Sequence, residues 1–397
     1  MISEKRFDMF RVVLTHYNEK LLMTLFEDEH PVEISLFHDN PYPVGAIFNG
    51  RVQKIQDNIS ASFLDLAPHL TGFLPKTCYK CGDLVPVQIV REGTKTKDPE
   101  LTDSLSISGR YSVVYAKEGE LHVSSKLGRE EKKKLIAQIK PLLKDNKHAI
   151  VLRTNAAHVD PDVVMEEIVW HFEQLAWIQR FAPSRPMGML YSPQKEWVRA
   201  LMGLYTKRLD EIVTDDPTIY SMLEDMFDQN SDSVHLRFYE DADFSLLKLY
   251  SLEKHLKEAL QKRVWLKCGG FLVIEQTEAL VSIDVNSGKI KGTLNKEETV
   301  FQVNLEAAEE IARQVRLRNL SGIIMIDFIN MQEPQHKKQL LDALEERLRS
   351  DPVKTQVHGM TTLGLVEMTR MKGRKTLYEQ ARTVSDDETV SGDKGRI

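Results

Sequence analysis

The sequence has no long hydrophobic run. No stretch approaches the roughly 18 consecutive apolar residues that a membrane-spanning helix requires. Residues 1–14 scatter charges among apolar residues instead of placing a basic region before an apolar one. We therefore expect no membrane span and no secretion signal, and the cytoplasm is the expected location.

Cysteine is also scarce, since the chain has only three, Cys78, Cys81 and Cys268. Three cysteines are too few for the disulfide framework of a small secreted domain, which agrees with a reducing compartment. Cys78 and Cys81 form a C-x-x-C pair, but a structural zinc ion needs four ligands and the sequence offers no second pair. We interpret the pair as two small side chains in a surface segment.

An excess of positive charge is absent as well. The formal net charge is −6 at pH 7, which excludes a protein that coats nucleic acid through its overall charge. Any contact with RNA must therefore use local basic clusters, which are more often plain solvated surface. The candidates are Arg91, Lys95 and Lys97 and, later in the chain, Arg370, Lys372, Arg374 and Lys375.

The chain does contain enough apolar sequence, 42% of 397 residues, for two or more folded cores. Between Gly45 and Pro75, short apolar runs separated by turn residues predict a small antiparallel unit. In the run ASFLDLA, alternation places Leu64 and Leu66 on one face and Phe63 on the other. Phe63 is then displayed away from the core, where it can stack on a base.

Two mixed segments follow this unit. From residue 107 to 181 the pattern predicts the strands YSVVYA and AIVLRT around a helix over KKKLIAQIKPLL, and then a long helix over residues 161–181. Beyond them it predicts a helix over residues 246–264, a hairpin of GGFLVIEQ and ALVSIDV, a helix over 304–320, the strand GIIMIDF, a helix over 335–348 and a last strand, TTLGLVEM. Residues 383–397 are polar and aperiodic, which predicts a disordered tail.

The candidate catalytic residues follow two of these strands. ALVSIDV, the next helix and GIIMIDF form a βαβ unit, whose strands are normally parallel and often adjacent. Each strand carries an aspartate at its carboxyl end, Asp284 and Asp327, where functional groups of such sheets gather. Because both follow strongly apolar runs, an unpaired carboxylate would be costly to desolvate, so we expect a cation between them.

Magnesium suits this position, since it takes oxygen ligands and is often held by only one or two carboxylates. Asn286 lies two residues past Asp284, on the same side of an extended chain, and can orient a carboxylate, a water or the phosphate. Two alternatives stay open. Either aspartate can be a helix cap or a salt-bridge partner, and two adjacent carboxylates can also share a proton, although nothing nearby resembles a glycosidase or protease site.

Three blocks of the sequence resemble the signature blocks of the ribonuclease E/G family. They are KRVWLKCGGFLVIEQTEALVSIDVNSGK, NLEAAEEIARQVRLRNLSGIIMIDFINM and LGLVEMTR, and the likeness covers nearly the whole chain to about Leu377. The resemblance implies an α+β fold of several subdomains. These would be an RNase H-like scaffold at 1–39 and 190–258, an OB-fold RNA-binding subdomain at 40–105, a 5′-sensor subdomain at 106–189 and a DNase I-like catalytic subdomain at 259–382.

The resemblance also implies an activity. It is that of a magnesium-dependent endoribonuclease that cuts single-stranded RNA in rRNA and tRNA processing and in mRNA decay, stimulated by a 5′-monophosphate. The family's two magnesium-binding aspartates match Asp284 and Asp327, and its neighbouring asparagine matches Asn286.

The family's RNA-contacting residues can be matched in the same way. The arginine and threonine that grip a 5′-monophosphate match Arg153 and Thr154, which are suitable donors for a terminal phosphate. The sensor's glycine and valine are similar to Gly109 and Val113. The aromatics and lysine of the RNA channel match three residues, although either Phe is alternatively an ordinary core residue of the OB fold: Phe63, Phe73 and Lys97.

The chain departs from the family pattern after LGLVEMTR. Family members usually continue with a C-x-x-C zinc link and a small domain that builds a tetramer, and neither follows here. We therefore expect a short, ribonuclease G-like form, and the resemblance leaves a homodimer open. The expected partners are single-stranded RNAs, namely rRNA precursors and mRNA.

Two other classes of protein compete with this interpretation. One is a non-catalytic protein that binds single-stranded RNA and whose aspartates are structural. The other is a purely structural or assembly protein. The joint presence of Asp284, Asn286 and Asp327 argues against the first, and Phe63, Lys97 and Arg153 argue against the second.

Overall fold

The computed structural model describes residues 9–93, 97–125, 127–143, 148–204, 209–227, 234–241, 243–288 and 296–382. The disordered tail predicted at 383–397 lies outside these ranges. The chain divides into two compact units: unit 1 comprises Met1–His38 and Lys207–Ile397, and unit 2 comprises Asp39–Thr206. Within the described ranges, no helix is both long and apolar enough to cross a membrane.

Unit 1 contains a five-stranded sheet in the order β15-β14-β1-β2-β3. Tight turns at Asn18 and Asp28, both in the left-handed conformation that these residue types tolerate, connect its first three strands. Leu246, Leu252 and Leu256 from the helices pack on this sheet. The elements are β1 (Phe10–Tyr17), β2 (Lys20–Glu27), β3 (His30–Phe37), β14 (Glu211–Thr214), α4 (Pro217–Phe227), β15 (His235–Phe238), α5 (Leu246–Leu249) and α6 (Leu252–Leu260).

The single helix predicted over residues 246–264 is wrong in two respects. The backbone turns left-handed at Ser251, with φ +50°, which separates α5 from α6. The helix then ends at Leu260, and Arg263–Trp265 form strand β16 instead. The apolar spacing of the helix continues across both breaks, so periodicity alone does not reveal them.

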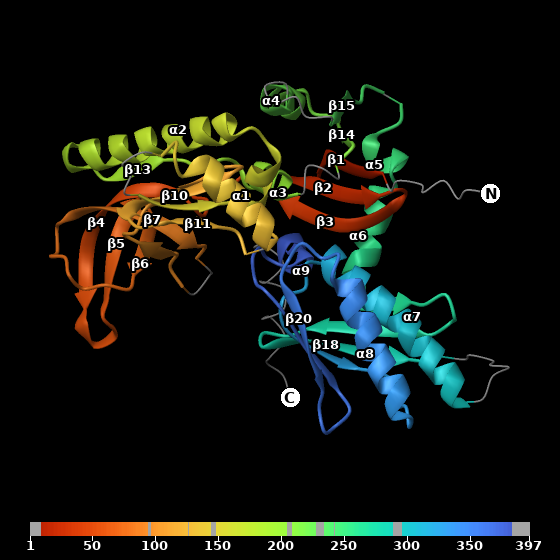
Figure 1. Ribbon diagram of the computed structural model, residues 1–397. Helices are drawn as coiled ribbons and strands as arrows, with labels where there is room; N and C mark the ends of the chain where they lie inside the picture. The colour runs from red at the N-terminus through yellow and green to blue at the C-terminus, as the bar shows by residue number, and fades with distance from the viewer. Residues whose placement is uncertain are drawn as a thin grey trace, which may run out of the picture. The chain divides into compact units, whose positions relative to one another are not determined.

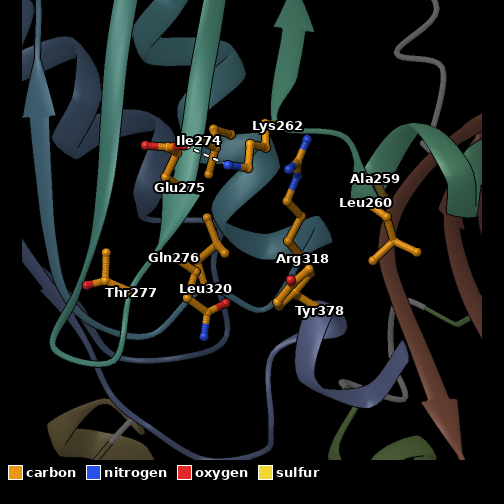
Figure 2. Close-up of a pocket in the computed structure, with 10 residues that line it drawn as sticks. All are labelled: Ala259, Leu260, Lys262, Ile274, Glu275, Gln276, Thr277, Arg318, Leu320 and Tyr378. Carbon is orange, nitrogen blue, oxygen red and sulfur yellow. Dashed lines mark hydrogen bonds and ion pairs between the residues drawn. The ribbon is translucent and has the colours of Figure 1, made fainter. Parts of the chain in front are cut away.

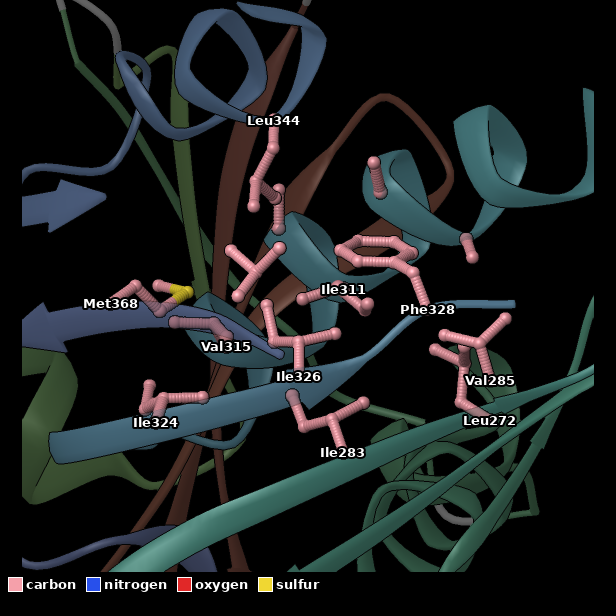
Figure 3. Packing of buried hydrophobic residues seen from close by; sticks show 14 of the residues in the cluster. Leu272, Ile283, Val285, Ile311, Val315, Ile324, Ile326, Phe328, Leu344 and Met368 are labelled. Carbon is pink, nitrogen blue, oxygen red and sulfur yellow. The ribbon is translucent and has the colours of Figure 1, made fainter. Parts of the chain in front are cut away.

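A second sheet in unit 1 carries the strands of the βαβ motif, in the order β16-β17-β18-β19-β21-β20. Helices α7 and α8 cover one of its faces (Figure 1). Figure 3 shows Ile283, Ile324 and Ile326 of this sheet directed toward Ile311 and Leu344 of the helices. The further elements are β17 (Phe271–Gln276), β18 (Leu280–Asn286), α7 (Lys296–Leu317), β19 (Gly322–Asp327), α8 (Pro334–Leu348), β20 (Thr355–Met360), β21 (Val366–Arg370) and α9 (Leu377–Ala381).

The last predicted strand, TTLGLVEM, begins too early. Thr361 to Leu365 form the turn between β20 and β21, closed by the amide of Thr361 donating to the Leu365 carbonyl at 2.8 Å. Gly364 has φ +89°, a conformation that favours glycine and suits a turn. Only the part from Val366 onward is a strand.

Unit 2 contains a five-stranded barrel. Strands β4, β5, β6, β8 and β7 are joined in that order, and β4 also pairs with β7, which closes the sheet on itself. Leu64 and Leu66 are buried in its core while Phe63 is only half-buried, so the predicted alternation is confirmed. The elements are β4 (Ile47–Gln56), a 3-10 turn (Asp57–Ile59), β5 (Ala61–Ala67), β6 (Leu70–Leu74), β7 (Leu84–Arg91) and β8 (Glu100–Thr102), with β13 (Gly188–Tyr191) paired to β4.

A four-stranded sheet in the order β11-β12-β10-β9 forms the rest of unit 2. Helix α1 ends at Ile139, earlier than predicted, because Pro141 has no N–H group with which to continue the helical hydrogen bonds. Helix α2 has the predicted bounds, with Asp160 capping its start and Pro161 in the first turn. The elements are β9 (Ser106–Ser108), β10 (Ser112–Glu118), β11 (Leu121–Val123), α1 (Arg129–Ile139), β12 (His148–Leu152), α2 (Pro161–Phe181), α3 (Glu196–Gly203) and the 3-10 turns Thr154–His158 and Ala182–Ser184.

Candidate active site

The two candidate aspartates are direct neighbours. Strands β18 and β19 are parallel and adjacent, and Asp284 and Asp327 are partner positions in their register. Adjacent strands lie about 4.8 Å apart. The register therefore confirms the prediction that these two carboxylates converge at the carboxyl ends of neighbouring strands.

Both carboxylates stand on the face of the sheet that α7 and α8 leave uncovered. Ile283 and Ile326, one residue earlier in each strand, point into the core, so Asp284 and Asp327 point to the opposite face and are exposed. The expectation that they would be desolvated is therefore wrong. In the apolar run before each aspartate, every second side chain faces the helices, and the aspartate falls at a position that faces solvent. Nδ2 of Asn286 donates to Oδ2 of Asp284 at 2.6 Å, which fixes the orientation of that carboxylate.

The donor set suits magnesium better than a soft metal. Within the described ranges, no three His, Cys, Asp or Glu side chains gather in a geometry that would hold a metal ion. Two carboxylates on an open face leave the remaining positions of an octahedral ion to waters and phosphate oxygens, which is how magnesium commonly binds. Asp284 and Asp327 would be its ligands, and Asn286 would orient the first of them.

The sequence analysis missed other groups on the same open face. Phe271 is the partner position of Asn286, and Trp265 is the partner of Phe271 on the edge strand β16. The rings of Trp265 and Phe271 are 5.3 Å apart, and the guanidinium of Arg263 lies 4.5 Å from the Phe271 ring. Trp265 is 64% exposed. The sequence analysis did not single out Trp265, because the helix predicted over residues 246–264 ended directly before it and no strand was predicted there.

Gly109 and Arg153 of the predicted 5′ sensor come together. Nη1 of Arg153 donates to the Gly109 carbonyl at 2.6 Å, and the Arg153 amide donates to the Tyr111 carbonyl at 2.7 Å. Thr154 follows in the chain, with Oγ1 3.2 Å from Oγ of Ser124. Val113 lies on β10, just past the turn that contains Gly109. Burial lowers the pKa of Arg153, and the nearby Glu167 carboxylate opposes that effect.

Glu167 of α2, which the sequence analysis did not single out, organises this turn. Its carboxylate accepts hydrogen bonds from the backbone amides of Arg110, Tyr111 and Ser112 at 2.6 to 3.0 Å and from the Ser112 hydroxyl at 2.7 Å. A Cβ at Gly109 would lie 2.3 Å from the Glu167 carboxyl carbon. Glycine at position 109 therefore permits the carboxylate to approach the turn.

Phe63 and Phe73 face each other across β5 and β6 as partner positions, with ring centroids 5.7 Å apart. Both are half-buried and lie outside the core cluster of the barrel. Lys54 is the partner of Phe63 on β4 and is exposed, so a cation borders the aromatic pair. Lys97 is exposed and precedes β8, whose Glu100 is the partner of Phe73.

Three arginines of the predicted basic clusters form ion pairs within the chain. Arg370 is buried and forms an ion pair with Asp351, and Arg374 forms one with Glu33. Arg91 pairs with Glu100. Arg370 is therefore not part of a surface patch, because alternation along β21 directs it into the interior, whereas Lys372 and Lys375 are exposed. Lys95 lies outside the described residues.

The cysteines of the C-x-x-C pair, Cys78 and Cys81, are both exposed and form no disulfide. They lie between β6 and β7 of the barrel, in unit 2.

A mixed α/β chain with a closed five-stranded, OB-like barrel and a carboxylate pair on an open sheet face has the parts of a nucleic-acid-processing protein. Comparison with known proteins makes this specific. Residues 106–373 match the ribonuclease E/G family. The chain belongs to the ribonuclease E/G family.

Individual relatives agree with this assignment. Ribonuclease E of Synechocystis is 33% identical over 359 residues, covering 85% of this chain and 53% of the relative. Ribonuclease G of Salmonella typhimurium is 30% identical over 362 residues, covering 84% and 74%. Ribonuclease G of Haemophilus influenzae is 30% identical over 384 residues, covering 89% and 77%. The chain thus spans about half of the ribonuclease E and about three-quarters of the two ribonucleases G.

Proposed function

We propose that this protein is a magnesium-dependent endoribonuclease that cuts single-stranded RNA at the open sheet face bearing Asp284 and Asp327. The observation that carries the proposal is the register of β18 and β19, which makes these two exposed aspartates direct neighbours. Family membership supports the type of reaction.

The chain's own residues would divide the work as follows. Asp284 and Asp327 supply negative charge and oxygen ligands at one point, and Asn286 holds Asp284 in position through its hydrogen bond. Bound there, magnesium would polarise the scissile phosphate and acidify a water. The open face gives an extended strand access, and Trp265 and Phe271 offer a surface on which a neighbouring base can stack.

Single-strand preference follows from the aromatic pairs. Phe63 and Phe73 with the bordering Lys54 combine stacking faces with a cation, as proteins that bind single-stranded nucleic acid commonly do. Bases paired in a duplex do not expose these faces. Stimulation by a 5′-monophosphate is the expected role of Arg153 and Thr154, since a guanidinium and a hydroxyl suit a terminal phosphate dianion.

Several finer assignments belong to the same proposal. The five-stranded sheet of unit 1 would be the RNase H-like scaffold, its six-stranded sheet the DNase I-like catalytic subdomain, and the four-stranded sheet of unit 2 the 5′ sensor. The barrel supports an OB-type RNA-binding role. The proposed substrates are rRNA and tRNA precursors and mRNA, the proposed location is the cytoplasm, and a homodimer is the proposed assembly.

A cleavage assay on matched RNAs tests the proposal. A linear single strand, a circular form of the same sequence and its duplex are incubated with the protein in magnesium or in EDTA. We expect internal cuts in the linear and circular strands, only with magnesium, and no cuts in the duplex. Binding of the single strand without any cleavage would instead identify a non-catalytic RNA-binding protein.

A further inference from the structure

A cavity of about 330 Å³ lies within unit 1, away from the paired aspartates. Its wall comes from the end of α6, from β17 and the turn after it, from the segment after α7 and from α9 (Figure 2). Gln276 of the wall pairs with Val281 at the turn of the β17–β18 hairpin, whereas Phe271 pairs with Asn286 at its other end. The cavity and the candidate metal site therefore lie toward opposite ends of this hairpin.

Arg318 lines the cavity and is buried, with 6% of its surface exposed. Its Nε donates to Oε1 of Gln314 at 2.5 Å, and its Nη1 donates to the Gln261 carbonyl at 2.6 Å. Both acceptors are neutral. Considering the described residues alone, Nη2 is buried without a hydrogen-bond partner. Burial lowers the pKa of Arg318 to about 10, so the side chain is still a cation at neutral pH.

Arg370 shows how the same unit accommodates another buried arginine. It is 4% exposed, and its Nε and Nη2 donate to the Asp351 carboxylate at 2.6 and 3.1 Å. No ion pair of this kind is found for Arg318 in the described ranges. A desolvated cation without an anion is costly. Burial lowers the pKa of Arg318 and Glu310 raises it from a distance, but the Glu310 carboxylate accepts from Arg313 and Gln314, so Nη2 of Arg318 can still take an anion from outside the chain.

The other wall groups favour an anion over a cation. Among the described residues that line the cavity, Glu275 is the only carboxylate, and Nζ of Lys262 neutralises it at 2.8 Å. Oε1 of Gln276 lies 2.9 Å from Oγ1 of Thr376, whose single hydroxyl proton also lies within reach of Oε2 of Glu379 at 2.8 Å, and the Gln276 amide adds a polar group to the wall. Tyr378 adds a hydroxyl and a ring face beside the Arg318 side chain (Figure 2).

We propose that this cavity binds a small phosphate-bearing molecule, with the phosphate accepting from Nη2 of Arg318. The organic part of the ligand would lie against the apolar wall that Leu260, Ile274 and Leu320 form. A guanidinium is the preferred donor for phosphate, and the volume suits a metabolite-sized ligand such as a nucleoside monophosphate. The ligand would bridge α6, β17 and α9, so its binding stabilises unit 1.

Thermal unfolding of the full chain tests this site. Because phosphate is also the ligand proposed for Arg153, the measurement uses the Arg153→Ala background. Inorganic phosphate and AMP are each compared with sodium chloride of equal ionic strength. We expect phosphate or AMP, at about ten times the dissociation constant, to raise the melting temperature by about 2 to 4 °C more than chloride does.

Two variants attribute the effect to the cavity. Arg318→Lys cannot keep both existing bonds and also reach an anion, and Leu260→Phe fills the apolar part, so each should abolish the rise. Arg347→Lys, an exposed change on α8, should retain it. The proposal would be overturned if phosphate and AMP raise the melting temperature no more than chloride does. It would also be overturned if the increase is the same in Leu260→Phe and in folded Arg318→Lys as in the parent protein.

A third arm identifies the source of the phosphate. A short oligoribonucleotide without terminal phosphates is titrated into protein that also carries Asp284→Asn, which prevents cleavage. If AMP raises the melting temperature in a way that requires Arg318, and the oligonucleotide does not, the ligand is a free metabolite. If only the oligonucleotide raises the melting temperature in a way that requires Arg318, the site binds a phosphate of the RNA backbone instead.

Discussion

Phe63 and Phe73 could either bind RNA by stacking or support the barrel core. Each is half-buried, and the two rings face each other outside the core cluster. Replacing Phe63 by Ala should weaken binding of single-stranded RNA by about 1 to 3 kcal/mol, because a base loses its stacking partner. Fluorescence titration with a labelled single strand measures this, alongside the melting temperature.

Leu64→Ala is the matched control, because this neighbour points into the barrel core. It should cost about 2 to 5 kcal/mol of stability and leave the affinity of the folded fraction unchanged. If Phe63→Ala loses stability as Leu64→Ala does and keeps its RNA affinity, Phe63 is a core residue.

His171 on α2 predicts a pH dependence of stability. The residue is 1% exposed, and burial lowers its pKa from 6.5 to about 4. The folded protein therefore keeps the neutral ring, while the unfolded chain takes up a proton near pH 6.5. The stabilising effect is complete above that pH and is lost as the pH falls toward 4, by about 3 kcal/mol at most.

Urea unfolding across this pH range checks the effect. His171→Gln should flatten the curve of unfolding free energy against pH, relative to the wild type. His122→Gln, at an exposed position, should leave the curve unchanged. Equal curves for all three proteins would show that burial of His171 does not control acid stability.

At the scale of elements, the edge strand β16 places Trp265 beside the candidate metal site. Because Trp265 neighbours Phe271, and Phe271 neighbours Asn286, a base stacked here would lie next to the scissile phosphate. Trp265→Ala should lower kcat/KM on single-stranded RNA by about ten- to a hundredfold, which corresponds to the loss of one stacked base. Trp170→Ala, an exposed tryptophan on α2, should have no effect. Equal cleavage rates for Trp265→Ala and Trp170→Ala would contradict a role of Trp265 in stacking a base.

The turn between β9 and β10 predicts a preference for the RNA 5′ end. Arg153 is held there by the Gly109 carbonyl, and Glu167 fixes the turn. Arg153→Ala should remove the preference for a 5′-monophosphate over a 5′-hydroxyl or triphosphate, a change of about ten- to a hundredfold. Cleavage of circular RNA should be spared.

One oligonucleotide with the three different 5′ ends provides the measurement, and the exposed Arg129→Ala on α1 is the control. If the wild type cuts all three RNAs equally, or if Arg153→Ala retains the preference, Arg153 has only a structural role.

The sequence predicts features that depend on neighbouring residues better than features that depend on residues far apart in the chain. Alternation predicted the faces of Leu64 and Phe63, because this pattern is local to one strand, and the apolar runs before both aspartates located their strands but not the face on which the aspartates lie. The break at Ser251 and the edge strand β16 escaped prediction, since apolar spacing does not report a left-handed residue. Glu167 escaped because its partners lie more than fifty residues away in the chain.

At the scale of the whole molecule, the two units carry different parts of the proposed function. Unit 1 is discontinuous, because β1 near the start of the chain pairs with β14, beyond the whole of unit 2. Strand patterns do not predict such a pairing, and only the family resemblance indicated an inserted segment. We therefore expect mutations at the proposed cleavage site in unit 1 to abolish cleavage but spare RNA binding, and mutations at the proposed RNA-binding and sensor residues in unit 2 to weaken binding or the 5′-end preference.

The account depends most on the carboxylate pair, so cleavage of one single-stranded RNA by Asp284→Asn and Asp327→Asn is the most direct measurement. Each change removes a metal-ligating charge without altering volume, which should cost several kcal/mol in the activation barrier. Glu367→Gln, an exposed carboxylate on β21, controls for the loss of charge on this sheet. We predict no cleavage by either aspartate variant at saturating magnesium, with RNA affinity and melting temperature retained, and normal cleavage by Glu367→Gln. Full activity of either aspartate variant would contradict the account.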